Sequence, residues 1–356
     1  MKKLLSNKNF KDNFITFGIV IAAYIIMQIL IGLGLVSSLL KGLLVPLCVY
    51  VIVAVALNLT VGILGELSLG HAGFMCIGAF TSAFFSKCMV NTITFAPLRF
   101  LIALLIGALS AGLIGFLVGM PVLRLKGDYL AIVTLAFGEI IKNLINVLYI
   151  GRDETGFHFS MQDSISLGLS ANGEVIVNGA QGITGTPNDS NFTIGVILII
   201  ITLIIVLNLI KSRDGRAVMS IRDNTIAAES VGINITKYKL MAFSISAALA
   251  GVAGVLYAHN LSSLMATPKN FGYNMSIMFL VFVVLGGIGS IRGSMIAAVI
   301  LTLLPELLRG LSDYRMLIYS IVLIVMMLFN WSPKLIEWRK RFSLKKRFFS
   351  KAKEVQ

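Results

Sequence analysis

Long apolar runs alternate with short polar segments along the chain. Bilayer hydrocarbon is roughly 30 Å thick and takes about 20 helical residues to cross. The runs that approach this length are 14–36, 42–62, 67–87, 98–119, 128–150, 192–210, 240–260, 273–287, 292–309 and 314–331. The pattern predicts an all-α fold, a polytopic transmembrane helical bundle of about 10 spans.

Glycines interrupt two pairs of these spans, the second with the third and the eighth with the ninth. Glycine is unfavourable inside a helix and marks turns or close approaches of the backbone. We therefore expect broken helices in both regions, and the number of spans is open there. These glycines are Gly62, Gly65 and Gly70 in the first region and Gly286, Gly287, Gly289 and Gly293 in the second.

Small residues recur at every fourth position in the fourth and seventh spans. Helices in a bilayer associate through close packing of small residues, since lipid tails are as apolar as leucine. Each row therefore predicts a tight seam between helices. The rows are Ala103, Gly107, Ala111, Gly115 and Gly119, and Ser246, Ala250, Gly254 and Ala258.

The composition shows that these runs are not the core of a soluble domain. Apolar residues make up 57% of the chain, charged residues 13%, and the mean hydropathy is +0.91. Soluble domains are about 45–50% apolar and about 25% charged, so a soluble enzyme, a disordered chain and a disulfide scaffold are excluded. Cys48, Cys76 and Cys88 have no metal-ligand spacing and are expected to be reduced packing residues.

The formal charge of +14 is interpreted as membrane topology rather than as a nucleic-acid-binding surface. With the N-terminus inside, most of the 30 Lys and Arg residues fall in cytoplasmic segments, which is the usual bias of membrane proteins. We therefore predict a cytoplasmic N-terminus (1–13), a transmembrane domain (14–331) and a basic cytoplasmic tail (332–356). The long loops are 151–191 outside and 211–239 inside.

The outer loop is polar and long enough to carry structure of its own. Its residues 165–169 and 174–177 are candidate short strands. The loop is either mobile or a partly ordered cap that meets a partner or a solute.

The sequence lacks the common enzyme and metal-site motifs. It contains no GxxxxGK[ST] phosphate loop, no HExxH pair and no GxSxG elbow. We therefore expect no enzymatic activity, no metal and no cofactor. Ionisable residues inside spans are costly and usually functional. Here they are few: Glu139 and Lys142 lie three residues apart on one helix face, where they can pair or line a polar pathway.

The inner loop contains an amphipathic segment that Gly232 is expected to end. Its less polar residues follow at steps of three and four, which is the spacing of one helix face. A helix in the largest inner loop can dock a cytosolic partner or lie on the lipid surface. The face consists of Val218, Ile221, Thr225, Ala228 and Val231.

Several stretches form an ordered set of motifs. They are 67–74, 129–140, 182–185, 215–224, 227–234, 239–243 and 285–293. Together they resemble the branched-chain amino acid permeases of ATP-binding cassette (ABC) importers, the LivM/LivH class. The stretch 129–140 and the long outer loop fit the LivM type better, and the resemblance extends from Val45 to Asn330.

The resemblance implies a permease subunit in the cytoplasmic membrane of a bacterium that imports branched-chain (hydrophobic) amino acids. Its partners would be two cytosolic ATP-binding subunits, a second permease in a heterodimer and an extracytoplasmic solute-binding protein. ATP would be bound by those partners and not by this chain.

The resemblance also implies two groups of functional residues. A coupling helix in the inner loop would dock the ATPase, and the glycine-rich regions would line the translocation pathway. The coupling residues are Ile221, Arg222, Asn224, Ala227, Ala228, Glu229 and Gly232. The pathway residues are Ser68, Gly70, His71, Glu139, Gly286, Gly287 and Gly289.

Three alternatives stay open. Related ABC permeases carry urea, short amides, sugars or nucleosides, and the external binding protein largely sets their specificity. A stand-alone secondary carrier would need more charged residues within the membrane. A membrane-embedded enzyme would need a catalytic constellation, and no known motif of that kind is present.

Overall fold

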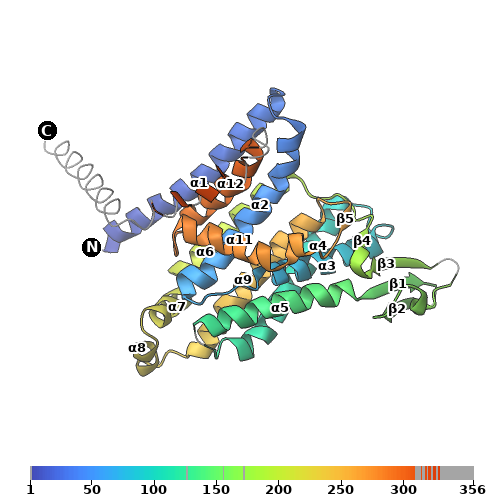
Figure 1. Cartoon of the computed structure of the whole chain (residues 1–356). Helices are drawn as coiled ribbons and strands as arrows, with labels where there is room; N and C mark the ends of the chain where they lie inside the picture. Colours follow the sequence, from blue (N-terminus) through green and yellow to red (C-terminus); the bar gives the residue numbers. More distant parts are fainter. Residues whose placement is uncertain are drawn as a thin grey trace.

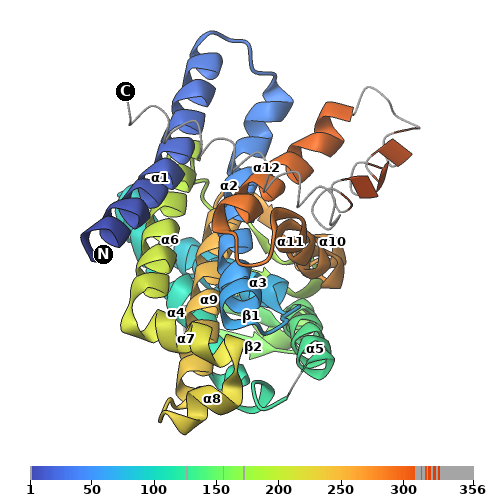
Figure 2. The same cartoon turned by 90° about the vertical axis from the view of Figure 1, so that its left-hand side faces the viewer.

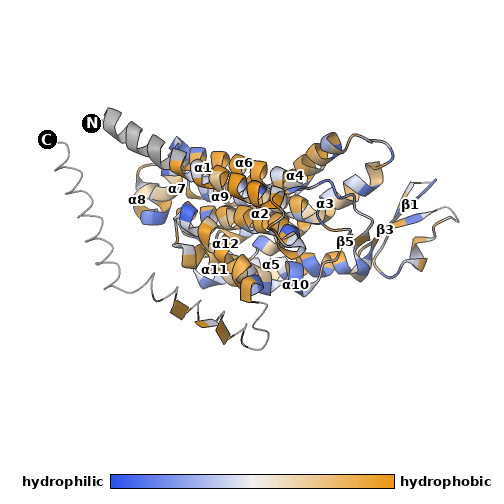
Figure 3. Cartoon of the chain, turned by 90° about the horizontal axis from the view of Figure 1, so that it is seen from above, coloured by the Kyte–Doolittle hydropathy of each residue, from blue (hydrophilic) through white to orange (hydrophobic). Residues whose placement is uncertain are grey.

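The computed structural model describes residues 2–125, 127–154, 156–170 and 173–308, with isolated positions between 314 and 328. Long helices form a bundle, and a small sheet extends from one end of it (Figure 1). Helices α7 and α8 lie at the opposite end (Figures 1 and 3). The helices are α1 (Lys2–Gly32), α2 (Ser38–Asn58), α3 (His71–Met89), α4 (Ala96–Val122), α5 (Asp128–Asn146), α6 (Phe192–Lys211), α7 (Arg213–Asp223), α8 (Thr225–Ser230), α9 (Ile235–Ala258), α10 (Pro268–Phe271), α11 (Tyr273–Gly286) and α12 (Ile291–Leu307).

Seven helical segments of the described chain are long and apolar enough to cross a bilayer. They coincide with the predicted spans one to four and six to eight. The predicted fifth and ninth spans are also helical, as α5 and α12, but they fall outside this set. The tenth, 314–331, lies outside the described residues except for isolated positions. The protein is therefore a polytopic helical membrane protein, with seven candidate spans among the residues that the structure describes.

Helix α9 is the centre of the bundle and packs against α2, α3 and α4. A Cβ atom on Gly254 would lie 2.8 Å from the Ala79 backbone nitrogen, and one on Gly107 would lie 2.9 Å from the Gly78 carbonyl oxygen. The small-residue rows thus let the backbones approach closely, and the predicted seams are confirmed.

The opposite face of α4 is a row of exposed leucines, Leu101, Leu105, Leu109 and Leu113. Figure 3 shows that hydrophobic residues dominate the bundle helices, whereas hydrophilic residues gather around α7, α8 and the sheet. Helix α1 lies at the edge of the bundle (Figure 2). Helices α1 and α4 are long enough to cross a bilayer, so their exposed apolar side chains indicate contact with lipid.

Each glycine-rich region connects two helices. Helix α2 continues into a π-helical turn, η1 (Leu59–Leu64), and the chain then runs without helix until α3 begins at His71. Helix α11 ends at Gly286, and Gly287 (φ +95°) and Gly289 (φ +81°) form the turn to α12. The expectation of broken helices is corrected: the breaks separate consecutive helices, because glycines with positive φ terminate them.

The sheet end contains two small antiparallel sheets with strand orders β2-β1-β3 and β4-β5. The strands are β1 (Tyr149–Asp153), β2 (Gly156–Ser160), β3 (Glu174–Asn178), β4 (Ile183–Thr184) and β5 (Ser263–Leu264). The predicted strand at 174–177 is confirmed as β3. The one at 165–169 is wrong, because Ile165–Leu167 forms a 3₁₀ turn. Strands β1 and β2 were not predicted, and the predicted fifth span, 128–150, extends into β1.

The predicted single helix from Val218 to Val231 is wrong. Helix α7 ends at Asp223, and Asn224 then adopts an extended backbone (φ −159°, ψ 106°). Its Oδ1 accepts a hydrogen bond from the Ala227 backbone nitrogen at 3.0 Å, which caps α8. Asparagine is among the best N-cap residues, so the loop bends into two short helices at this position.

Candidate coupling and translocation site

A buried polar network lies where η1, α3 and α9 meet. Ser246 on α9 donates to the Ala56 carbonyl oxygen (2.5 Å), accepts from Thr60 Oγ1 (2.8 Å) and is bonded to His71 Nε2 (2.7 Å). Because the single Ser246 proton goes to Ala56, the imidazole donates from Nε2, and its Nδ1 accepts from the Ser68 hydroxyl at 3.4 Å. The network fixes His71, which is 1% exposed, inside the bundle.

The segment that precedes α3 is held against α5. The Leu69 backbone nitrogen donates to Thr134 Oγ1 at 3.0 Å. A Cβ atom on Gly70 would lie 2.7 Å from the Thr134 carbonyl oxygen. The predicted pathway residues Ser68 and Gly70 therefore lie, like His71, in the packed interior of this conformation.

The two glycine-rich regions meet at a contact that we call the glycine junction, formed by Asn58, Gly62, Gly289 and Ser294. Asn58 Oδ1 accepts from the Gly289 backbone nitrogen at 2.9 Å, and Asn58 Nδ2 donates to Ser294 Oγ at 2.8 Å. A Cβ atom on Gly62 would overlap Asn58 Oδ1 and the Gly289 backbone nitrogen. Only glycine lets η1 and the α11–α12 turn touch in this way.

Two further predicted pathway glycines shape the α11–α12 turn. A Cβ atom on Gly286 would overlap the backbone of Gly293, so these two residues bring the ends of the helices together. Gly287 supplies the positive φ that reverses the chain. The structure thus brings Gly289 into direct contact with Gly62, whereas Gly286 and Gly287 support the turn.

Arg222, at the end of α7, reaches the glycine junction. Its Nη1 donates to the Gly62 carbonyl oxygen at 2.6 Å. Its stem crosses Gly65, where a Cβ atom would lie 2.5 Å from Arg222 Cγ. Beside it, Lys239 and Glu66 form a largely buried ion pair between α9 and the segment after η1.

The other predicted coupling residues divide into buried and exposed groups. Ile221 and Ala228 are buried, whereas Val231 of the same predicted face is 75% exposed. Asn224, Ala227, Glu229 and Gly232 are exposed. Ile226 was not among the predicted coupling residues, although it is 80% exposed on α8. Its signal in the sequence is an isoleucine that lies off the apolar face of an otherwise polar loop.

Glu139 and Lys142 form the predicted ion pair on α5. Glu139 Oε1 also accepts from the Tyr273 backbone nitrogen at 2.6 Å, at the first turn of α11. The carboxylate therefore caps α11 as well as neutralising the buried lysine, since a negative charge is favourable at a helix N-terminus.

At the sheet end, a second polar cluster fastens the loop before α6 to the bundle. Arg99 on α4 donates to Asp189 from Nε (2.9 Å) and from Nη2 (2.8 and 2.7 Å), and both side chains are buried. His259 is bonded to Ser86 Oγ at 2.7 Å and to the Val255 carbonyl oxygen at 2.9 Å. This cluster, which we call the sheet-end lock, was not predicted from the sequence.

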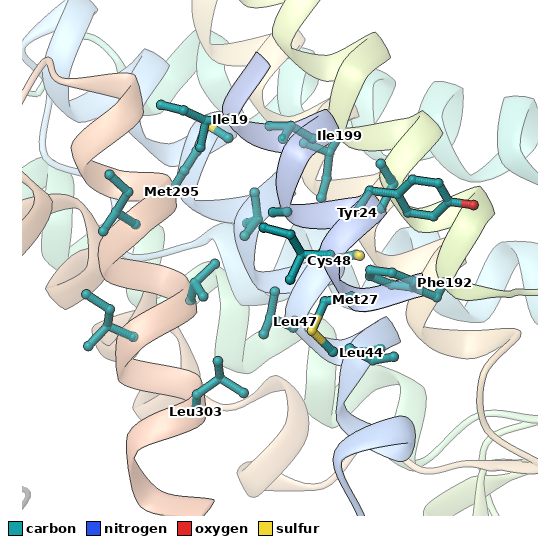
Figure 4. A pocket seen from close by; sticks show the side chains of 18 of the residues that line it. Ile19, Tyr24, Met27, Leu44, Leu47, Cys48, Phe192, Ile199, Met295 and Leu303 are labelled. Carbon is teal, nitrogen blue, oxygen red and sulfur yellow. The ribbon is translucent and has the colours of Figure 1, made fainter. Parts of the chain in front are cut away.

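An apolar groove of about 450 Å³ lies between α1, α2, α6 and α12 (Figure 4). Met27, Leu44, Cys48 and Met295 are among the side chains that line it. Its walls offer almost no polar surface to the ammonium and carboxylate of an amino acid. Such a groove suits hydrocarbon and not a zwitterionic solute.

Within the described residues, no group of three or more His, Cys, Asp or Glu side chains could hold a metal ion. Residues 39–330 match the family model described as "Branched-chain amino acid transport system / permease component". No solved structure matches the chain.

Several curated proteins are similar to this chain. The high-affinity branched-chain amino acid transport system permease protein LivM of Escherichia coli (strain K12) is 35% identical over 296 residues, covering 80% of this chain and 67% of LivM. LivH of the same organism is 23% identical over 286 residues, covering 78% of this chain and 88% of LivH. The nucleoside ABC transporter permease protein NupC of Lactococcus lactis is 24% identical over 213 residues, covering 56% of this chain and 60% of NupC.

Proposed function

The chain belongs to the family of permease components of branched-chain amino acid transport systems, and on that premise we propose that it imports branched-chain amino acids as one half of a membrane pathway in a bacterial cytoplasmic membrane. The family is one of transporter permeases and not of enzymes. ATP is used by the partner subunits of ABC systems, so the chain needs no cofactor of its own. The likeness to LivM over most of the chain is the observation that carries the proposal.

We propose that the α7–α8 end faces the cytoplasm and the sheet end faces outward. The positive-inside bias of the sequence supports this orientation. In this arrangement 1–13 and 332–356 are cytoplasmic, and 14–331 is the permease domain. The sheet and the sheet-end lock then lie where an external solute-binding protein would deliver the solute.

The loop 211–239 is proposed to dock one of two cytosolic ATPase subunits. Ile226 and Val231 are 80% and 75% exposed. Both side chains are apolar, so burying them against a partner protein would be favourable. Asn224, Ala227, Glu229 and Gly232 surround them. Ile221 and Ala228 anchor the loop to the bundle from the other side, so a push on α8 is passed to α7.

The translocation pathway is proposed to open at the glycine junction and beside Glu139. In the present conformation Gly289 closes on Gly62, whereas Ser68, Gly70 and His71 are enclosed by neighbouring helices. A half-buried carboxylate and exposed backbone groups at glycines can satisfy an amino acid's ammonium and carboxylate. Gly286 and Gly287 set the position of the turn that carries Gly289.

A nucleoside or another small solute is the second candidate, because the likeness to NupC extends over 213 residues. If the external binding protein selects the solute, the permease itself does not distinguish branched-chain amino acids from nucleosides. The family match favours branched-chain amino acids.

The test is to purify the chain with the proteins that accompany it and to measure ATP-dependent uptake in proteoliposomes. We expect two ATPase subunits, a second permease, and uptake of leucine, isoleucine and valine once the external binding protein is added. Uptake of nucleosides or urea with no uptake of leucine would replace the proposed solute. Uptake that needs no ATPase would contradict the ABC mechanism.

A further inference from the structure

We propose that Arg222 transmits the movement of the docking loop to the π-helical turn η1 and so opens the glycine junction, and that it is not part of the ATPase-binding surface. This inference rests on the proposed function, because it assumes that an ATPase moves α7 and α8. It assigns to Arg222 a positioning role within the chain.

Arg222 makes one hydrogen bond into the bundle and two to its exposed neighbour Asp223. All three guanidinium nitrogens donate within the chain: Nη1 to the Gly62 carbonyl oxygen (2.6 Å), and Nε and Nη2 to Asp223 Oδ1 (3.3 and 3.2 Å). Its side chain is 40% exposed, and that of Asp223 is 70% exposed. The 2.6 Å bond to the Gly62 carbonyl oxygen is therefore the contact through which Arg222 can act on the bundle.

The bundle side of this contact is shaped to receive an arginine. Gly65 has φ +81°, and the absence of a side chain leaves the space that the Arg222 stem fills. The same guanidinium lies near Gly289, where a Cβ atom would be 3.8 Å from Arg222 Nη1. One side chain thus reaches η1, the segment after it and the α11–α12 turn.

The Gly62 carbonyl belongs to a π-helical turn. A π-helical turn is rare and is found frequently at functional sites. Gly62 also touches Gly289, and Asn58 at the start of η1 accepts from the Gly289 nitrogen. A pull on the Gly62 carbonyl therefore acts directly on the contact between the two glycine-rich regions.

The key variant is Arg222→Met in the full transporter complex, because methionine keeps much of the stem and removes every donor. We expect normal recovery of the ATPase subunits and about a tenfold fall in solute transported per ATP hydrolysed, the loss expected for a hydrogen bond to a charged group. Arg216→Met is the matched control: Arg216 lies on the same helix and donates to the Lys211 carbonyl oxygen of its own loop. It should transport like the parent.

Arg222→Lys separates hydrogen bonding from packing. Lysine keeps the charge and one set of donors, so transport per ATP should recover partly. A folded Arg222→Lys complex that is as inactive as Arg222→Met would overturn the hydrogen bond as the cause. Parental transport by Arg222→Met would overturn the whole inference, and so would loss of the ATPases from Arg222→Met when Arg216→Met retains them.

A second readout follows the junction itself. Ile288, 55% exposed in the α11–α12 turn, is replaced by Cys, and its rate of maleimide labelling is compared with and without vanadate-trapped nucleotide. We expect nucleotide trapping to change the labelling rate of the Ile288→Cys variant that keeps Arg222. In the double variant that also carries Arg222→Met, trapping should leave the labelling rate unchanged. An equal change in both backgrounds would overturn the inference. Failure of the proposed function is distinct, because the parent complex itself would then show no ATP-dependent uptake.

Discussion

At the sheet end, the loop before α6 is fastened to α4 by the buried ion pair of Arg99 and Asp189, with three short charge-assisted hydrogen bonds. At the α7–α8 end, the glycine junction is held by hydrogen bonds between neutral groups and by contact between glycine backbones. Both contacts join segments distant in sequence, but their chemistry differs.

The difference has a physical consequence. Separating a buried ion pair leaves each charge without its counter-charge, whereas separating neutral amide and hydroxyl groups costs much less. The glycines add backbone freedom to the second contact. The sheet-end lock is therefore expected to stay closed in every state of the protein, and the glycine junction to open and close.

The largest effect is expected when the sheet-end lock loses one partner. Arg99→Met leaves the Asp189 carboxylate buried without its cation, and this should lower the free energy of unfolding by about 3–5 kcal/mol. The measurement is the thermal unfolding midpoint, Tm, of the purified protein in detergent, together with the folded yield.

The matched control for Arg99→Met is Glu174→Gln. Glu174 also pairs with a lysine, Lys87, at 3.1 Å, but its side chain is 70% exposed. Breaking that pair should cost less than about 1 kcal/mol. If Arg99→Met and Glu174→Gln lowered Tm equally, the sheet-end lock would not be the rigid contact described here.

The next effect is expected at Gly62. Gly62→Ala places a Cβ atom on Asn58 Oδ1 and the Gly289 nitrogen, so η1 and the turn must separate, at a cost of about 2–3 kcal/mol. Uptake should be lost while the complex still assembles. Gly18→Ala is the control, since nothing lies within 4 Å of a Cβ at that position. Normal uptake by Gly62→Ala would show that the junction need not close.

The sequence predicted those parts of the architecture that depend on a single local property of the chain. Runs of apolar residues located the helices, and small residues at every fourth position located the α4–α9 seam. The two glycine-rich regions were located for the same reason. The contact between them was not predicted. Asn58 and Ser294 are 236 positions apart, and each is an ordinary polar residue in its own span.

The direction of Arg222 was unpredictable for a different reason. The amphipathic period extends through Asn224, so it indicates one helix, whereas the cap at Asn224 starts a second helix. Val231, on the predicted apolar face, is 75% exposed as a result. Arg99 and Asp189 are lone charges beside spans, 90 positions apart. Nothing near either residue in sequence identifies its partner.

A smaller effect is expected when the glycine junction loses one side chain. Asn58→Ala leaves the Gly289 N–H without its acceptor and removes one donor to Ser294 Oγ, which still donates to the Ser290 carbonyl oxygen at 3.2 Å. This should cost about 1–2 kcal/mol and lower the solute transported per ATP hydrolysed. Asn146→Ala removes a comparable bond, from Nδ2 to the Ala266 carbonyl oxygen at 3.0 Å, away from the junction. Equal losses of coupling in both variants would remove the distinction between the two ends.

The smallest effect on stability is expected on the outer face of α8. Ile226→Ser removes an apolar side chain that is 80% exposed, so the free energy of unfolding should change by less than about 0.5 kcal/mol. Binding of the ATPase subunits should nevertheless weaken, because the burial of that side chain against the partner is lost. Co-purification and Tm are measured on the same sample.

Ile205→Ser is the control, since Ile205 is also exposed, on α6, and should leave the ATPases bound. Full recovery of the ATPases with Ile226→Ser would place the docking surface elsewhere, and the glycine junction would then need another source of movement.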